Sequence, residues 1–201
     1  GMELVRLLLR AGVDLNSRRV VGCEALARWV HPTLGSIPPS LFIPVAEETG
    51  LISDITRWVL RTATAECMNW PETVSVSVNV SARDFRNTDV EEMVMDALVE
   101  SGLAPDRLEI EVTETALIEE KEAATKILGA LGKRGIGIAL DDFGTGYSSL
   151  SYLQALPFTK LKVDRSFVMD IGSNARSLKL LSNVAQLGKD INLTVTAEGV
   201  E

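Results

Sequence analysis

The stretch Ile136–Tyr147, IGIALDDFGTGY, decides which fold this chain is expected to adopt. Its apolar residues continue to Leu140 and stop at two adjacent carboxylates, Asp141 and Asp142. A short aliphatic run with a polar end is typical of a strand that is buried on both faces, as in parallel sheets. Neighbouring anions repel each other, so they need a cation or one of them must be protonated. The simpler alternative is that Asp142 caps a turn and Asp141 faces solvent.

Strands and helices alternate along the rest of the chain. From residue 74 onward this alternation predicts a parallel sheet with right-handed crossovers. Gly102 and Gly135 follow two of the predicted helices, where glycine commonly ends a helix. Strands are predicted at 74–80, 108–113, 136–141, 160–164 and 193–197, and helices at about 89–101, 119–134, 147–155 and 175–188.

The first part of the chain has a different pattern. Residues 5–27 predict a hairpin with a turn at 14–17, although the first of its two segments is equally compatible with a helix. Residues 31–44 contain four prolines and predict a loop. Ser53 is expected to cap a helix that continues to about residue 70.

The 201 residues suffice for one domain with a sizeable core, and a single domain over residues 1–201 is expected. A net charge of −8 argues against binding of a nucleic-acid polymer, but an anionic ligand could be held through a cation. Cys23 and Cys67 form neither a CxxC motif nor a disulfide framework, which favours a reducing, cytoplasmic setting. No apolar run approaches the roughly 20 residues of a membrane helix, although the chain could be the cytoplasmic domain of a larger, membrane-bound protein.

Polar residues recur at or near the carboxyl ends of the predicted strands. In a (β/α) barrel these ends meet at one rim, where such folds hold their active sites. Oxygen ligands without histidine favour Mg²⁺, Mn²⁺ or Ca²⁺. Since five carboxylates exceed what one Mg²⁺ usually binds, two ions are expected, which would suit phosphoryl displacement by water. The polar residues are Glu24, Asn79, Glu111, Asp141, Asp142, Lys162 and Glu198.

Several of these residues have simpler interpretations. Glu24 could be a solvated strand residue, Asn79 a buried structural amide and Lys162 a surface lysine. Lys162 could also form a Schiff base with a carbonyl substrate, but the surrounding acids favour a protonated lysine beside water and phosphate. Arg28 suits either an acidic partner or a phosphate. Glu114 is expected to support the site rather than bind an ion.

Longer motifs follow one another in a fixed order: GCEALARW at 22–29, PPSLFIPVAEETGLI at 38–52, NVS at 79–81, EVTE at 111–114, DDFGTGYSSLSYL at 141–153, LKVDRSFV at 161–168 and TAEGVE at 196–201. Together they closely resemble the EAL family, whose active members are bacterial cyclic di-GMP phosphodiesterases. The resemblance covers residues 14–201. It implies a modified (β/α)8 TIM-type barrel whose first strand is antiparallel to the others, which agrees with the predicted hairpin.

The resemblance also implies a reaction and its ligands. One phosphodiester of cyclic di-GMP would be hydrolysed to give linear pGpG, with Mg²⁺ or Mn²⁺ as cofactor. The catalytic residues would be Lys162, which would orient or polarise the attacking water, with Glu24 and Asp141. The metal ligands would be Glu24, Asn79, Glu111, Asp141, Asp142 and Glu198.

Four further residues take supporting roles by resemblance. Arg28 and the backbone of Leu26 would contact the dinucleotide. Glu114 would anchor the loop at 143–147, and Glu201 matches a further glutamate near the site.

Two departures from the family pattern stand out. Arg10, Ala11 and Gly12 occupy the positions of a usual Gln-Pro-Ile, so the glutamine that touches ligand is replaced. The family also continues with a strand, a Gln-Gly motif and a helix, so the chain is expected to lack the last βα unit and to leave the barrel open. A second copy of the chain in a homodimer, or a rearranged N-terminal segment, is expected to cover that edge. The alternative function is an inactive EAL domain that senses cyclic di-GMP or binds a protein.

Overall fold

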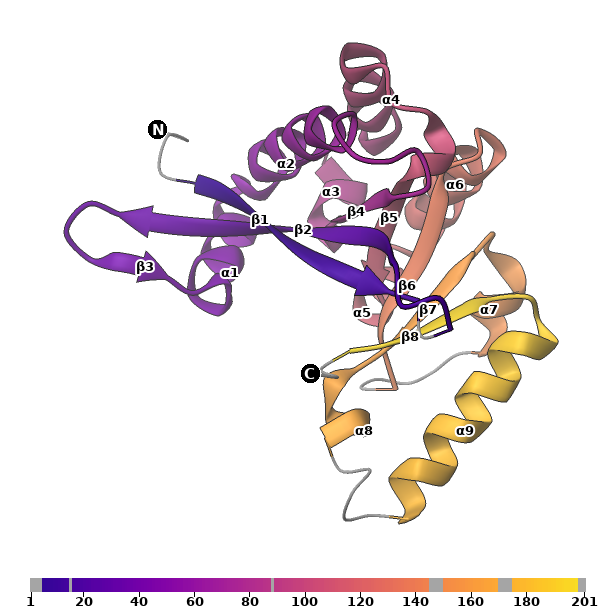
Figure 1. The fold of residues 1–201 in the computed structure, drawn as a ribbon. Coiled ribbons are helices and arrows are strands. Elements are labelled where there is room, and N and C mark those ends of the chain that lie inside the picture. Colours follow the sequence, from indigo (N-terminus) through magenta and orange to yellow (C-terminus); the bar gives the residue numbers. More distant parts are fainter. Residues whose placement is uncertain (1–4, 15, 88, 145–149, 170–174, 199–201) are drawn as a thin grey trace.

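The computed structural model describes residues 5–14, 16–87, 89–144, 150–169 and 175–198, and one curled sheet forms its centre (Figure 1). The strands are β1 Val5–Val13, β2 Val20–His31, β3 Gly35–Ile37, β4 Ser75–Asn79, β5 Leu108–Thr113, β6 Gly137–Phe143, β7 Lys160–Val163 and β8 Thr194–Ala197. Their order in the sheet is β1-β2-β4-β5-β6-β7-β8, with β3 beside β2.

The hairpin and the parallel sheet predicted from the sequence are both confirmed. β1 pairs antiparallel with β2, whereas every neighbouring pair from β2 to β8 along the sheet is parallel. The α/β architecture with an antiparallel first strand is therefore the one expected of a modified TIM-type barrel. Within the described residues β1 and β8 are the two edges, and no backbone pairing joins them.

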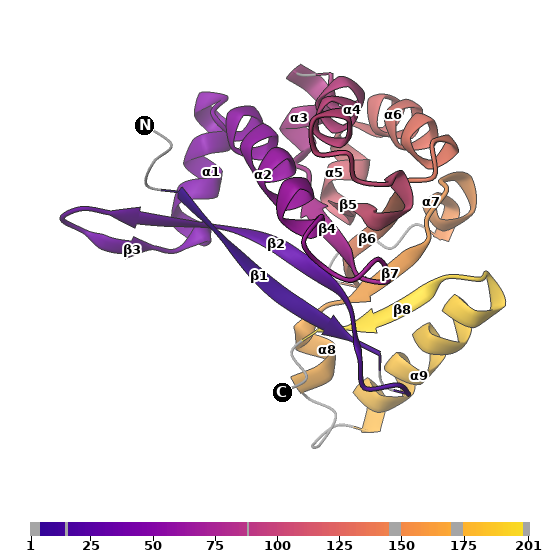
Figure 2. The same ribbon diagram turned by 45° about the horizontal axis from the view of Figure 1, so that its top comes forward.

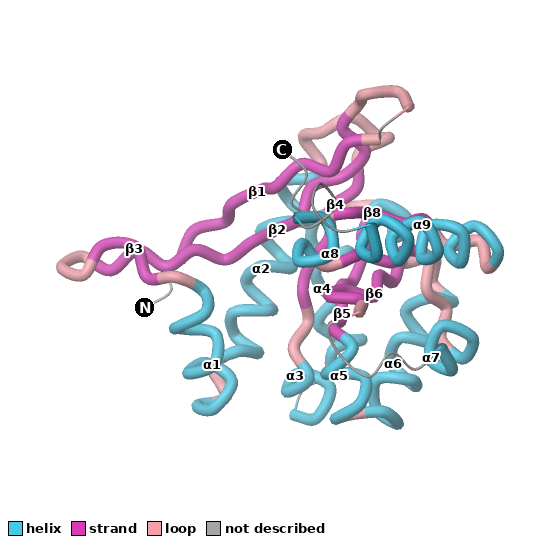
Figure 3. Tube along the Cα trace, turned by 90° about the horizontal axis from the view of Figure 1, so that it is seen from below, coloured by secondary structure: helices cyan, strands magenta, loops and turns pink. Residues whose placement is uncertain are grey.

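The helices lie around the sheet, and the long β1–β2 hairpin projects past them with β3 at its far end (Figures 2 and 3). Of the longer helices, α2 packs against α4 and α4 packs against α6, so these helices cover neighbouring strands. The helices are α1 Pro39–Thr49, α2 Ile52–Cys67, α3 Ala82–Asn87, α4 Val90–Ser101, α5 Glu114–Glu119, α6 Lys121–Lys133, α7 Leu150–Ala155, α8 Arg165–Met169 and α9 Ala175–Asp190, with a 3-10 turn at Pro105–Arg107.

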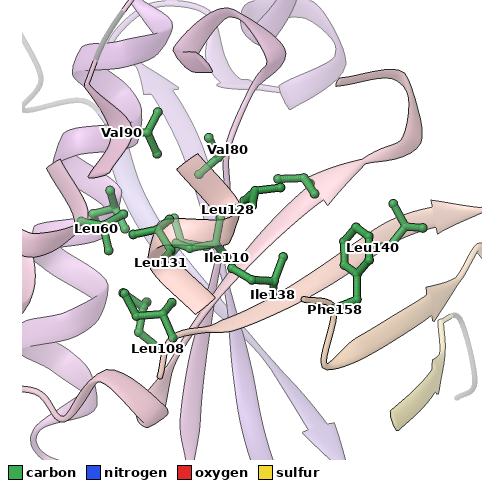
Figure 4. Close-up of a cluster of buried hydrophobic side chains, with 14 of the residues drawn as sticks. Leu60, Val80, Val90, Leu108, Ile110, Leu128, Leu131, Ile138, Leu140 and Phe158 are labelled. Atoms are coloured by element: carbon green, nitrogen blue, oxygen red, sulfur yellow. The ribbon is translucent and has the colours of Figure 1, made fainter. Parts of the chain in front are cut away.

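The core lies between the central strands and these helices. Ile110 and Ile138 from adjacent strands meet Leu60, Leu128 and Leu131 from the helices, and all five side chains are fully buried (Figure 4). Burial on this scale explains why the central strands are near-continuous apolar runs, which is the pattern that predicted them.

The proline-rich segment 31–44 is not the loop that its composition predicts. β3 occupies part of it, and α1 begins at Pro39. Proline is favoured at the first helical position, where its missing N–H would have no partner, and Pro38 before it has the extended backbone of a residue outside the helix. Pro44 lies inside α1, so the number of prolines was misleading here.

The predicted start of the second helix is wrong. α2 begins at Ile52, so Ser53 is its second residue, and Leu51 at the cap position makes no side-chain capping bond. The Ser53 hydroxyl donates a hydrogen bond of 2.7 Å to Asp84.

The helix predicted at 119–134 is confirmed as α6, Lys121–Lys133, whereas the short α5 before it was not predicted. The two helices are separated at Glu120, whose φ of −124° is not helical. The first of them starts directly after β5, where Thr113 accepts a hydrogen bond from the Ala116 N–H and satisfies the helix start.

The helix predicted at about 175–188 is confirmed as α9, which continues two residues further, to Asp190. A Cβ at Gly188 would overlap a methyl group of Val195, so this glycine serves close packing of α9 on β8. α8 was not predicted, because five residues are too few to show a helical period. No helix among the described residues combines the length and apolar character needed to cross a bilayer.

Replacing Leu60 by alanine should lower the free energy of unfolding by about 2–5 kcal/mol, because the side chain is fully buried and would leave a cavity. Leu41→Ala is the matched control in a neighbouring helix, since Leu41 is 63% exposed and should change stability by less than about 0.5 kcal/mol. Urea unfolding followed by circular dichroism measures both. Equal losses would contradict the described core.

Candidate functional site

Six polar side chains lie close together at the carboxyl ends of the strands. Five of them lie on strands, and the sixth belongs to the residue that follows β8. Asn79 ends β4, Asp141 lies near the end of β6, and Glu198 follows β8. Parallel pairing puts Asn79 beside Glu111, since these residues are opposite each other in register. The members are Glu24, Asn79, Glu111, Asp141, Lys162 and Glu198, hereafter the acidic cluster.

Side-chain alternation along β5 and β7 produces two layers inside the curled sheet. Glu109 and Glu111 share a face, as do Lys160 and Lys162, because residues two apart on a strand point the same way. In the layer nearer the amino ends of the strands, hereafter the lower layer, Lys160 donates to Glu109 at 2.6 Å. In the layer nearer the carboxyl ends, hereafter the upper layer, Lys162 donates to Glu111 at 2.6 Å. Glu109 is therefore buried in an ion pair rather than facing solvent.

The Lys162 ammonium lies among four carboxylates. Its Nζ atom is 2.6 Å from Glu111, 3.0 Å from Glu198, 3.1 Å from Asp141 and 3.6 Å from Glu24. Burial opposes the charge on this lysine, but attraction by Glu111, Asp141 and Glu24 outweighs burial and raises its pKa well above the usual range. The lysine is therefore protonated, which disfavours the Schiff-base alternative because an ammonium group is not a nucleophile.

Glu111 is the carboxyl group of the cluster whose negative charge is strongly disfavoured by its surroundings. Burial raises the pKa of this carboxyl to about 7, and the negative charges of Glu24 and Asp141 add to the rise that Lys162 opposes. Glu24 behaves differently, because Lys162, Arg10 and Asn79 together outweigh its burial and lower its pKa. The cluster thus contains more negative charge than its own cations balance.

Three of the acids are close enough to share an ion. Single oxygens of Glu24, Glu111 and Asp141 all lie within 4.8 Å of one another. Asn79 is held against them, since its amide donates to Glu24 at 3.0 Å. An oxygen-only set of carboxylates and an amide favours Mg²⁺, Mn²⁺ or Ca²⁺ over zinc.

The other two predicted ligands lie beside this trio. Asp142 has a positive φ of 53°, and its backbone N–H donates to the Asp141 carboxylate at 2.9 Å. Burial raises the pKa of Asp142, as do the nearby charges of Asp141, Asp164 and Glu198. Glu198 contacts Lys162 but is not part of the 4.8 Å trio.

Two residues of the site were not predicted from the sequence. Asp164 lies close enough to Asp142 to raise its pKa, and its position directly after β7 was the available clue. Arg10 on β1 donates to both Glu24 and, at 2.6 Å, Glu198. The sequence identified Arg10 only as a substitution for a glutamine, although its register opposite Glu24 follows from the hairpin.

A cavity of about 440 Å³ adjoins the cluster through Asn79, which lines it. Leu26 and Arg28 line the same cavity, so these two predicted ligand contacts lie beside the acids rather than among them. The Arg28 guanidinium donates to the Ala27 carbonyl at 3.0 Å, which uses one of its five N–H groups and leaves capacity for an anion. The cavity can therefore hold an organic ligand whose anionic part reaches the cluster.

Glu114 begins α5 and is buried, with both carboxylate oxygens lacking hydrogen-bond partners among the described residues. The loop that Glu114 was expected to anchor includes residues 145–147, which lie outside the described residues, as does Glu201.

A family model described as the EAL domain matches residues 5–201. Among curated relatives, the bifunctional diguanylate cyclase/cyclic di-GMP phosphodiesterase MucR of Pseudomonas aeruginosa is 41% identical over 186 residues, which covers 90% of this chain and 27% of the relative. The chain spans about a quarter of the length of the curated relatives it matches.

Two solved structures are similar over nearly the whole chain. The PaMucR phosphodiesterase in its c-di-GMP complex has a TM-score of 0.93 and 39% identity, and the match covers 98% of this chain and 82% of that one. Klebsiella pneumoniae BlrP1 in a manganese/cy-diGMP complex has a TM-score of 0.85 and 34% identity, over 99% of this chain and 50% of that one.

Replacing Lys162 by methionine should lower the free energy of unfolding in EDTA by about 3–5 kcal/mol, because four carboxylates would lose their shared buried cation. Lys160→Met is the matched control two residues earlier on the same strand. Its side chain is 25% exposed and contacts one acid, so its loss should be smaller. Urea titrations of both variants measure the difference, and a larger loss for Lys160→Met would contradict the central place of Lys162.

Proposed function

The chain belongs to the EAL domain family of cyclic di-GMP phosphodiesterases, and from that premise we propose that it hydrolyses cyclic di-GMP to linear pGpG with Mg²⁺ or Mn²⁺. One observation carries the proposal. Carboxylates from separate strands surround Lys162, and Asn79, whose amide donates to one of them, lines a cavity that also presents Arg28. A buried excess of negative charge is unfavourable for folding, which is the expected state of a site built for cations.

Glu24, Glu111 and Asp141 would hold the divalent ions, with Asn79 beside them and Asp142 and Glu198 completing the set. Divalent ions in such a set lower the pKa of water and offset the charge of a phosphodiester. The family comparison supports this assignment, since the similar BlrP1 structure is a manganese/cy-diGMP complex.

The chain's own residues would bind and orient the substrate. The Lys162 ammonium has three donors and stays charged, so it can orient the attacking water and attract a phosphate oxygen. Arg28, whose forked guanidinium matches a phosphate, would bind the dinucleotide together with the Leu26 backbone. The cavity would remove the substrate from bulk water, which strengthens these contacts.

The second candidate function is a sensor that binds cyclic di-GMP without cleaving it. The observation that favours it is Arg10, which already occupies two of the proposed ligand carboxylates. Incubation with cyclic di-GMP and Mn²⁺ separates the two, because only the enzyme yields pGpG, whereas the sensor binds and releases the dinucleotide unchanged.

Replacing Glu24 or Asp141 by alanine should lower pGpG production at least about 100-fold, because loss of a direct ligand should exceed the 10–100-fold cost of losing a residue that only supports one. Glu109→Ala is the control, since Glu109 is buried on the same face of β5 but pairs with Lys160. Chromatographic separation of cyclic di-GMP and pGpG measures activity, with EDTA expected to abolish it in the unmodified chain. Unchanged turnover in either variant would contradict the assigned site.

Replacing Arg28 by alanine should raise KM for cyclic di-GMP about 10–100-fold with little change in kcat, because a charge-assisted hydrogen bond to a phosphate is lost from substrate and transition state alike. Arg6→Ala is the matched control, since Arg6 lies opposite Arg28 in the hairpin register but does not line the cavity. Initial rates over a range of substrate concentrations give both constants. An unchanged KM in Arg28→Ala would place the dinucleotide elsewhere.

A further inference from the structure

Arg10 lies on one edge strand of the sheet and contacts a carboxylate beside it and another that follows the opposite edge strand. It lies on β1, in register with Glu24, and its Nη2 atom donates both to Glu24 and, at 2.6 Å, to Glu198 after β8. β1 and β8 have no backbone pairing among the described residues, so this guanidinium spans the opening of the curled sheet. The Arg10 side chain is half exposed, while Glu24 and Glu198 are 9% and 16% exposed.

The carboxylate oxygens that Arg10 contacts are ones that an ion would need. Oε2 of Glu24 faces Arg10 and Lys162, while its Oε1 accepts from Asn79. Oε1 of Glu198 faces the same two cations. Glu198 is accordingly absent from the trio of acids that lie within 4.8 Å of one another. The trio can share one ion, and Glu198 is held by Arg10 instead.

We propose that the Arg10 guanidinium is a resident cation of the acidic cluster that takes the place of one divalent ion, so that the chain binds one ion tightly rather than two. The proposal rests on the proposed function, because it concerns the same ligands. An arginine remains protonated at any pH at which the chain is folded, so proton loss cannot vacate the position. A second ion must break two charge-assisted hydrogen bonds and approach a fixed positive charge.

A purely structural role for Arg10 makes a different prediction. If the guanidinium only joins β1 to the end of β8, its loss should lower stability and leave the number of bound ions unchanged. If it occupies an ion position, its loss should also create metal-binding capacity. Counting ions therefore separates the two roles without any measurement of activity.

The test is calorimetric titration of the metal-free full chain with Mn²⁺, with electron paramagnetic resonance to detect coupled ion pairs. The unmodified chain should bind one ion tightly. Arg10→Gln should bind a second ion, or bind a weak second ion about tenfold or more tightly than the unmodified chain does. The reason is that the charge-assisted hydrogen bonds of Arg10 no longer compete with the ion for the carboxylates. Arg10→Lys keeps the charge and should keep the single ion. Arg6→Gln removes a charge four residues earlier on the same strand and should also leave the count unchanged.

Two tight ions of equal affinity in both the unmodified chain and Arg10→Gln would overturn the proposal while leaving the proposed function standing. A second ion in Arg10→Lys would also overturn it, since charge would not be the cause. Binding of no Mn²⁺ by either protein would overturn this proposal and the proposed function together. If Arg10→Gln does not fold, the ion count of the unmodified chain decides, with two tight ions against the proposal and one in its favour.

Discussion

Repulsion among buried carboxylates, offset by the Lys162 ammonium, is the interaction on which the arrangement of the site depends. Glu24, Glu111 and Asp141 are brought within 4.8 Å of one another by strands whose register is fixed by backbone pairing and an apolar core. The sheet can impose this proximity because its core is formed independently of the acids. The Lys162 Nζ atom at 2.6–3.6 Å from four acids lowers the free-energy cost of this repulsion, but four carboxylates still outnumber the two cations, Lys162 and Arg10.

The two layers of charged side chains inside the sheet differ in their charge balance, although the same strands supply both. Glu109 and Lys160 form a one-to-one pair in the lower layer, where nothing further is needed to balance their charges. Two residues further along the same strands, Glu111 and Lys162 belong to a layer with surplus acid beside the cavity. The 2-residue period of a strand is enough to produce this change from a balanced pair to an unbalanced cluster.

The sequence predicted the central strands and their polar ends well because burial on both faces leaves a simple pattern. β5 was predicted at its observed bounds, 108–113, and Glu111, Asp141 and Lys162 lie together as the barrel hypothesis required. Features decided by distant contacts were missed. Ser53 lies inside α2 and donates to Asp84, 31 residues away, and Arg10 contacts Glu198, 188 residues away. No local pattern could indicate either contact. The roles of these residues in binding and catalysis stay predictions.

Glu198 shows why side-chain charges as well as the sheet determine the shape of the cluster. It follows β8, an edge strand that pairs only with β7 among the described residues, and its N–H donates to the Val163 carbonyl at 3.2 Å. Beyond that single backbone bond, Lys162 and Arg10 hold its carboxylate. The other acids are positioned by strands that pair on both sides. Glu198 is therefore the proposed ligand most able to move, and the cation it binds decides whether it faces Arg10 or joins the other three acids.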